Sequence, residues 1–93
     1  MTKALWDGVI LAESEETMLV EGNHYFPLRA VRQEYLQPSE TQTTCPWKGV
    51  AGYYNIVIGR KVNKDAAWYY PDPKPAAREI KDHIAFWKGV SVG

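Results

Sequence analysis

The sequence predicts a single, mainly β domain with one short helix near its C-terminus. Its length limits the architecture, because 93 residues cannot supply two cores that are each stable alone. Asp7-Gly8 is a strong hairpin signal, since both central residues of a type I′ turn need positive φ. Residues 53–58 alternate with the period of two that is typical of strands. We therefore expect antiparallel strands joined by short turns.

Strand and turn signals alternate through the N-terminal third of the chain. The expected order is a buried strand at residues 9–12, a polar connection at 13–16, a strand at 17–21, a turn at Gly22-Asn23 and a strand at 24–26. Pro27 has no N–H group to donate to a neighbouring strand, so the last strand must end there or lie at a sheet edge. Residues 28–36 are ambiguous, because they suit either a helical face or a turn that leads into a strand.

The rest of the chain continues this pattern and adds the only clear helix signal. The expected order is a polar β segment at residues 41–44, a loop at 45–49, strands at 53–58 and 66–70 around a turn at 59–64, and strands at 84–87 and 90–92. Pro71-Asp72-Pro73-Lys74-Pro75 is stiff and extended, since each proline fixes its own φ. Pro75 suits the first position of a helix, so we expect one short C-terminal helix at residues 76–82.

Charge and cysteine content restrict the classes of partner. Eleven basic residues balance eleven acidic ones, and nucleic-acid-binding domains usually carry a basic patch, so we expect no nucleic-acid partner. The single cysteine excludes an internal disulfide and a cysteine-built zinc site, and we expect no metal or other cofactor. A lone free thiol is typical of a reducing compartment. With no signal-peptide pattern and no long apolar run, it predicts a cytoplasmic protein without a membrane partner.

The loop Cys45-Pro46-Trp47-Lys48-Gly49 concentrates a thiol, an indole and an ammonium. Cys45 is a candidate catalytic nucleophile if Lys48 lowers the pKa of its thiol, although packing as a small buried side chain is the preferred interpretation. Lys48 could bind a carboxylate or a phosphate as a point charge. The structural alternative for Lys48 is an ion pair with Asp65 or a carbonyl contact that closes the loop.

Aromatic side chains elsewhere could complete a binding cleft beside this loop. Trp68 lies in a predicted strand, where one face would feed the core and the opposite face could line a groove with Tyr25 and Trp47. Core packing is the preferred role for Trp68, since large aromatic side chains dominate the burial of small domains.

Three polar residues are further candidates for this site. His24 and Asp65 form a candidate acid–base pair. Arg29 could add a cationic contact to a ligand, with a solvated surface position as its preferred role.

Several motifs together indicate a family. The stretches that carry the resemblance are Gly8-Val9, Leu11-Ala12-Glu13-Ser14, Tyr25-Phe26-Pro27, Thr44-Cys45-Pro46-Trp47-Lys48-Gly49, Ala51, Tyr53-Tyr54, Asp65-Ala66-Ala67-Trp68-Tyr69-Tyr70-Pro71-Asp72-Pro73, Ile80 and Ala85-Phe86. The most specific are the Cys-Pro-aromatic-Lys-Gly loop and the Asp-x-x-Trp-x-Tyr-x-x-Pro segment. In this order they resemble the small bacterial and fungal domain family DUF427, also labelled a nucleotidyltransferase-like domain.

The resemblance implies a compact fold of curved antiparallel sheets, similar to Mss4-like or β-tent barrels. Those relatives often hold zinc with two Cys-x-x-Cys pairs, which this chain lacks, so the metal role does not carry over. The sequence departs from the family pattern at Ala30, where an acidic residue usually precedes the valine at Val31. Neither a carboxylate cluster for Mg²⁺ nor a glycine-rich phosphate loop supports the nucleotidyltransferase label.

The sequence leaves three functions open. The favoured one is a binding module for a small anionic or aromatic molecule in a cleft near the 45–49 loop, because no catalytic base stands out. The first alternative is a small enzyme that uses Cys45 as nucleophile, or His24 and Asp65 as acid and base. The second is a protein-interaction domain, through a peptide docked on a sheet edge or a homodimer.

Overall fold

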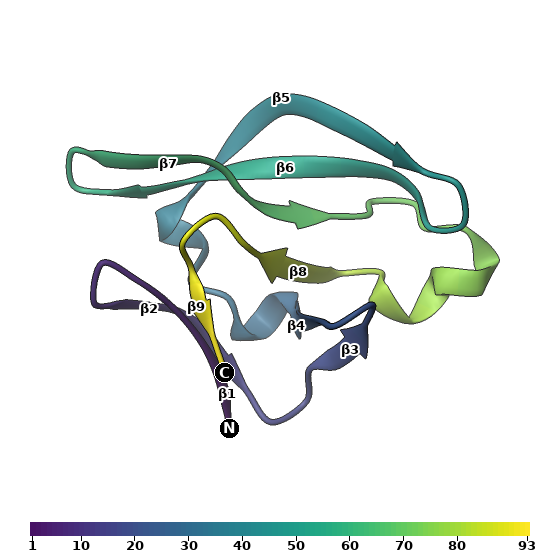
Figure 1. Ribbon diagram of the computed structural model, residues 1–93, viewed down its shortest axis with the longest axis horizontal. Coiled ribbons are helices and arrows are strands. Elements are labelled where there is room, and N and C mark those ends of the chain that lie inside the picture. Colours follow the sequence, from purple (N-terminus) through teal and green to yellow (C-terminus); the bar gives the residue numbers. More distant parts are fainter.

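Two antiparallel sheets form the computed structural model, which describes residues 1–93 (Figure 1). The small sheet has the order β2-β1-β9, with β1 at Thr2–Trp6, β2 at Val9–Ser14 and β9 at Ser91–Val92. The large sheet has the order β3-β4-β8-β7-β6-β5, with β3 at Met18–Val20, β4 at Asn23–Pro27, β8 at His83–Phe86, β7 at Lys61–Tyr69, β6 at Gly49–Ile58 and β5 at Leu36–Cys45. The predicted single, mainly β domain of antiparallel sheets is confirmed. However, β3 and β5 are sheet edges, so the large sheet does not close into a barrel.

Tight turns with positive φ join the hairpins. Asp7-Gly8 has φ values of 53° and 76° and connects β1 to β2, as the sequence predicts. The β3–β4 turn lies one residue earlier than predicted, at Glu21 (φ 53°) and Gly22 (φ 79°), and Asn23 already belongs to β4. Non-glycine residues rarely adopt this left-handed conformation, so no sequence signal favours Glu21 for it. The turn predicted at 59–64 is shorter, because β6 ends at Ile58 and β7 begins at Lys61, which leaves only Gly59 and Arg60 between them.

Three short 3₁₀ segments stand where the sequence allows helices. The segments η1 (Leu28–Ala30) and η2 (Gln33–Tyr35) occupy the ambiguous stretch and lead directly into β5. The helix predicted at residues 76–82 is instead η3, a 3₁₀ segment at Pro75–Ile80 with non-helical backbone at Ala77. Such a short segment gains little from helix propagation, so tertiary packing decides its shape. None of the three has the length or the apolar character that a membrane-spanning helix needs.

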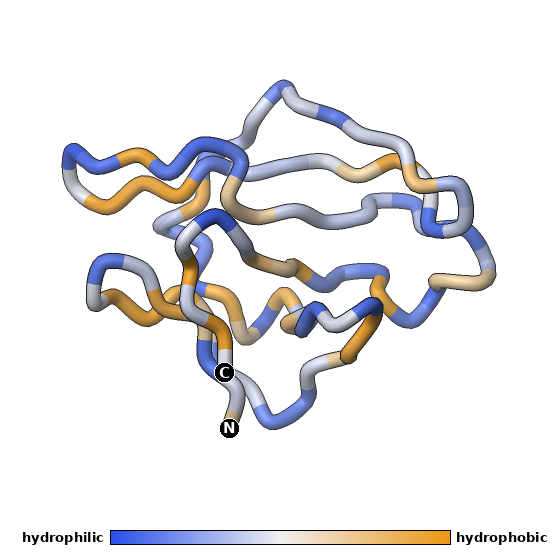
Figure 2. Tube along the Cα trace, viewed as in Figure 1, coloured by the Kyte–Doolittle hydropathy of each residue, from blue (hydrophilic) through white to orange (hydrophobic).

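The main core lies between the two sheets. Ala4 and Leu11 of the small sheet pack with Phe26, Ile56 and Phe86, which lie in β4, β6 and β8 of the large sheet. All five residues are buried. Burial of this apolar surface is the main favourable term in folding. Figure 2 shows the corresponding hydropathy, since β2 is mostly orange, whereas the edge strand β5 is mostly pale or blue.

A second buried cluster packs near η3. Its members come from both halves of the chain: Tyr25, Ala51, Tyr70, Ala77, Ile80 and Ala85. Ala67 belongs to the main core, whereas Trp68 packs against this second cluster, because successive side chains of a strand point to opposite faces. Trp68 and Tyr70 are therefore on the same side of the chain, and that side carries the candidate site.

Irregular pairing curves the large sheet. The register shifts once within β5 and once between β6 and β7, and such bulges bend a strand and increase its twist. The β5–β6 loop consequently meets the β3–β4 turn, where the Lys48 ammonium forms an ion pair with Glu21. Because β3 and β5 are opposite edges in the strand order, this contact bridges the two ends of the sheet.

Candidate functional site

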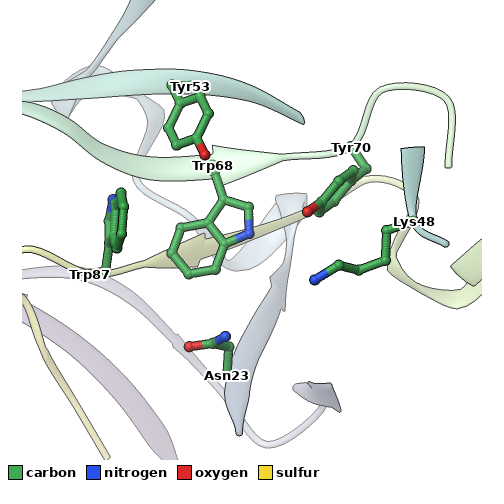
Figure 3. A pocket seen from close by; sticks show the side chains of 6 residues that line it. All are labelled: Asn23, Lys48, Tyr53, Trp68, Tyr70 and Trp87. Carbon is green, nitrogen blue, oxygen red and sulfur yellow. The ribbon is translucent and has the colours of Figure 1, made fainter. Parts of the chain in front are cut away.

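A cavity of about 260 Å³ opens beside the second cluster (Figure 3). Its lining comes from β4, the β5–β6 loop, β6, β7 and the segments that follow β7 and β8: Asn23, Lys48, Tyr53, Trp68, Tyr70 and Trp87. These residues converge because β7 pairs with both β6 and β8. Four of the six side chains are aromatic, so the cavity has flat, apolar walls with two polar groups at its border.

Trp68 stands at the centre of the aromatic wall. Its ring meets those of Trp87 and Tyr25 edge-to-face, with centroids 5.6 and 6.0 Å away. Its indole N–H donates to the Tyr25 hydroxyl at 3.1 Å, and the Trp87 indole N–H donates to the Asp65 carbonyl at 2.5 Å. Both indole N–H groups are therefore already paired. The Lys88 ammonium lies over the Trp87 ring, 4.9 Å from its centroid, and the uncovered ring faces are available for apolar contact with a ligand.

Lys48 supplies the only positive charge in the lining. The residue is 6% exposed, and its ammonium lies 5.3 Å from the Tyr70 ring centroid and 5.6 Å from that of Trp47. Burial by itself lowers the pKa of Lys48, but the hydrogen bond to Glu21, with contributions from Tyr25 and Tyr70, outweighs burial and raises that pKa above its usual value. Lys48 therefore stays charged at physiological pH.

Glu21 is the anionic partner of this ammonium. Its carboxylate accepts hydrogen bonds from the Lys48 ammonium and, at 3.4 Å, from the Trp47 indole N–H. The hydrogen bond from Lys48 is the main cause that lowers the pKa of Glu21. The Glu21 side chain is 50% exposed, whereas that of Lys48 is 8% exposed, so the two partners of the pair differ sharply in their access to water.

The backbone around Lys48 is held by the segment that precedes η3. The Lys48 carbonyl accepts from the Lys74 N–H at 2.9 Å, and the Lys74 ammonium donates to the Pro46 carbonyl at 2.6 Å. Gly49 has φ of 113°, and a Cβ there would lie 3.3 Å from the Asp72 carbonyl oxygen. The loop thus needs glycine at this position and presents Lys48 from a fixed backbone.

Four of the predicted ligand-binding residues come together here. Lys48 and Trp68 line the cavity. Tyr25 is fully buried behind Trp68, and Trp47 is 39% exposed beside Lys48. The structure thus brings these four residues together, and their role in ligand binding stays a prediction. Trp68 packs against the second cluster, in line with its preferred role, and is partly exposed at the cavity wall.

Asp65 lies apart from this cavity. Its carboxylate accepts hydrogen bonds from the Ser39 hydroxyl at 2.5 Å and the Thr41 hydroxyl at 2.8 Å. The bond from Ser39 is the main cause that lowers the pKa of Asp65, although burial opposes it. The suggested ion pair between Lys48 and Asp65 is wrong, because the carboxylate that Lys48 contacts is that of Glu21.

His24 and Arg29 also point to other partners. The His24 Nδ1 is hydrogen-bonded to the Thr17 hydroxyl at 2.9 Å. Arg29 is exposed and forms an ion pair with Glu16. Neither lines the cavity, and an acid–base role for His24 with Asp65 stays a prediction.

Cys45 ends β5 and is half-buried, with a free thiol. It packs against the second cluster, which agrees with its preferred role in packing. The two imidazoles of the chain are hydrogen-bonded elsewhere, His24 to Thr17 and His83 to the Lys81 carbonyl. No three His, Cys, Asp or Glu side chains group in a way that could hold a metal ion.

Sequence reasoning missed several residues of the site. Tyr70 had a usable signal, because the period of two places it on the same side as Trp68. Trp87 and Asn23 had none, since only the pairing of β8 with both β7 and β4 brings their segments to the cavity. Glu21 looked like an ordinary charged residue near a turn.

A second cavity, of about 210 Å³, has a different chemical character. Its lining is Leu28, Tyr54, Tyr69, Tyr70, Pro71, Asp82, His83 and Ile84. It contains no lysine or arginine, so it offers no permanent positive charge to an anion.

Comparison with protein families gives a match over nearly the whole chain. A family model described as a domain of unknown function, DUF427, matches residues 1–92. A search of curated proteins finds no match to this chain. The family match covers every element that contributes to the cavity.

Proposed function

The chain belongs to the DUF427 family, and we propose that it is a binding module for a small anionic or aromatic ligand. The observation that carries this proposal is the cavity in which four aromatic side chains and one buried ammonium meet. Ligand sites are typically concave and apolar, with a few polar groups that fix the orientation of the ligand, and range from roughly 300 to 1,000 Å³. A cavity of about 260 Å³ lies just below this range, which favours a small molecule.

The two kinds of lining group suggest two kinds of contact. The faces of Trp68 and Trp87 offer a large apolar area for a flat ring. The ammonium of Lys48 offers a point charge with three donors, and its low exposure strengthens electrostatic contacts relative to water. A ligand that carries a ring and an anionic group would use both.

The fold supports a related proposal about ancestry. Two curved antiparallel sheets that enclose a core are compatible with a distant kinship to Mss4-like, β-tent domains. The open edges of the large sheet and the lack of zinc ligands would then be features of this branch.

Binding of 2-naphthoate, followed by quenching of tryptophan fluorescence, tests the proposed function. We expect saturable quenching by this aromatic anion. Replacement Lys48→Met should weaken binding about tenfold, because a hydrogen bond to a charged group typically contributes about 1.5 kcal/mol or more. The matched control is Lys61→Met, which removes the same charge from an exposed ion pair with Asp7 and should leave the affinity unchanged.

Two outcomes would contradict the proposal. One is a quenching curve that rises linearly with naphthoate and never saturates in the wild-type protein. The other is an equal loss of affinity in the Lys48→Met and Lys61→Met variants, which would assign the effect to overall charge rather than to the cavity.

A further inference from the structure

The ammonium at the cavity is already occupied by a carboxylate of the chain itself. Glu21 lies two residues before Asn23, which lines the cavity, and its carboxylate binds the Lys48 ammonium. In Figure 3 the Lys48 ammonium points into the space bordered by Trp68, Tyr70 and Asn23. A ligand anion that enters this space meets an ammonium whose charge Glu21 already balances.

The two ends of this ion pair are held very differently. Lys48 is nearly buried, and its backbone is fixed by hydrogen bonds to the segment at Lys74. Glu21 is half-exposed in a two-residue turn at the end of β3, which is an edge strand of only three residues. Release of Glu21 would return its carboxylate to water, to which half of its side chain is already exposed. Glu21 is therefore the partner that can leave.

Removal of Glu21 without a substitute would be costly for Lys48. A nearly buried charge that loses its partner is strongly destabilising. A ligand carboxylate in the same place would keep the ammonium paired, while Glu21 regains water. The exchange conserves the charge balance at Lys48, which makes a carboxylate a suitable replacement.

The lining also restricts the kind of anion. Lys48 is the only cation there, and no arginine contributes a planar fork, which is the group best matched to bidentate binding of phosphate. A doubly charged phosphate would have one ammonium for two charges. A single carboxylate matches one ammonium, and the aromatic walls match a ring attached to it.

From these contacts we propose that the ligand is an aromatic monocarboxylate whose carboxylate replaces that of Glu21 on Lys48. Glu21 thereby occupies the ligand's anionic position in the empty site and sets the specificity of the cavity. This inference rests on the proposed function and adds to it the chemical class of the ligand and a competing group within the chain.

The variant Glu21→Gln tests the competition. The probes are 2-naphthoate and its uncharged relative 2-naphthalenemethanol, each titrated by NMR with the indole N–H signals of Trp68 and Trp87 as reporters. Loss of the competitor should tighten naphthoate binding about three- to tenfold, the equivalent of a weak to moderate ion pair. Binding of the uncharged alcohol should not change, because it does not contact the Lys48 charge.

The matched control is Glu16→Gln. It removes the same carboxylate type and the same net charge from the exposed pair with Arg29, outside the cavity, and should leave both affinities as they are. If Glu21→Gln binds naphthoate no more tightly than Glu16→Gln does, the competition is overturned while the proposed function stands. If neither probe moves the two indole signals in any variant, the proposed function fails as well.

A measurement on the wild-type protein tests the same exchange and does not require the Glu21→Gln variant to fold. The side-chain carboxyl ¹³C signal of Glu21 should move toward that of an unpaired glutamate as naphthoate saturates the protein. The alcohol should leave this signal in place. A Glu21 signal that stays constant at saturation with naphthoate would overturn the proposed exchange.

Discussion

Asp65 is a buried carboxylate that hydroxyl groups hold in place. It has φ of 56°, accepts hydrogen bonds from Ser39 and Thr41 through its side chain, and offers its backbone carbonyl to the Trp87 indole. The last contact orients one wall of the cavity. Asp65 therefore holds β7 to β5 through its side chain and holds Trp87 through its backbone carbonyl, although it does not line the cavity itself.

Replacement Asp65→Asn should destabilise the protein by about 1.5–3 kcal/mol at pH 7, because hydrogen bonds to a charged acceptor contribute about this much. Asparagine tolerates the left-handed backbone, so the change isolates the charge. The folded state lowers the pKa of Asp65, so its contribution is present above the unfolded value of about 4 and is lost as the pH falls through the folded value. Urea denaturation at pH 7 and pH 3 should show a difference from wild type that shrinks at pH 3.

Asp82→Asn is the matched control for this experiment. Asp82 also has positive φ, 60°, but it is exposed, and its replacement should change stability by less than about 0.5 kcal/mol. A difference between Asp65→Asn and wild type that is the same at both pH values would contradict a role for the charge.

Single residues show where sequence reasoning ends. Pro46 and Gly49 restrict the backbone of the loop around Lys48, and such local preferences can be predicted from sequence because they depend on the residue itself. The ion pair of Lys48 with Glu21 could not be predicted from the sequence, because Glu21 lies 27 positions away and reaches Lys48 only when the sheet is curved. The sequence gives the charge of Lys48, but it does not show which carboxylate Lys48 contacts.

Among the elements, η3 is a segment whose conformation depends on the side chains that it buries. Its backbone makes few hydrogen bonds of its own, and the bond from the Lys81 N–H to the Arg78 carbonyl closes its last turn. Ala77 and Ile80 are each 1% exposed in the second cluster. The segment is thus fixed by packing beside the cavity wall rather than by helix propensity.

Replacement Ile80→Ala should cost about 2–4 kcal/mol of the free energy of unfolding, through lost burial and the cavity that remains. Its neighbour Glu79 is exposed, so Glu79→Ala should change stability by less than about 0.5 kcal/mol. Guanidinium denaturation of the two variants measures the contrast. Equal effects would show that intrinsic helix preference, and not burial, holds this segment.

Elements were predicted well where a turn residue defines them. Asp7-Gly8 fixes the first hairpin, since few residue pairs accept positive φ twice. The segment after Pro75 was assigned as a helix from its composition, but propensity is a weak guide and tertiary packing overrides it. In the structure, Ala77 and Ile80 are both buried in the second cluster, and the backbone between them is a kinked 3₁₀ segment.

At the scale of the whole molecule, curvature of the large sheet creates the site. The cavity lining spans the chain from Asn23 to Trp87, and the Lys48–Glu21 pair joins the two ends of the sheet. The alternation of a single strand could predict that Trp68 and Tyr70 share a face. Strand order and bulges, which bring Trp87 to that face, depend on long-range pairing that no local pattern encodes.

The position of a bound aromatic carboxylate shows whether the cavity at Trp68 and Lys48 is the binding site. We would measure intermolecular NOEs between 2-naphthoate and the wild-type protein at saturation. We expect contacts from the ring protons to Trp68 and Trp87, and from the protons beside the carboxylate to the side-chain methylenes of Lys48. Contacts to the second cavity, at Tyr69 and Pro71, with none to Trp68 or Lys48 would contradict it.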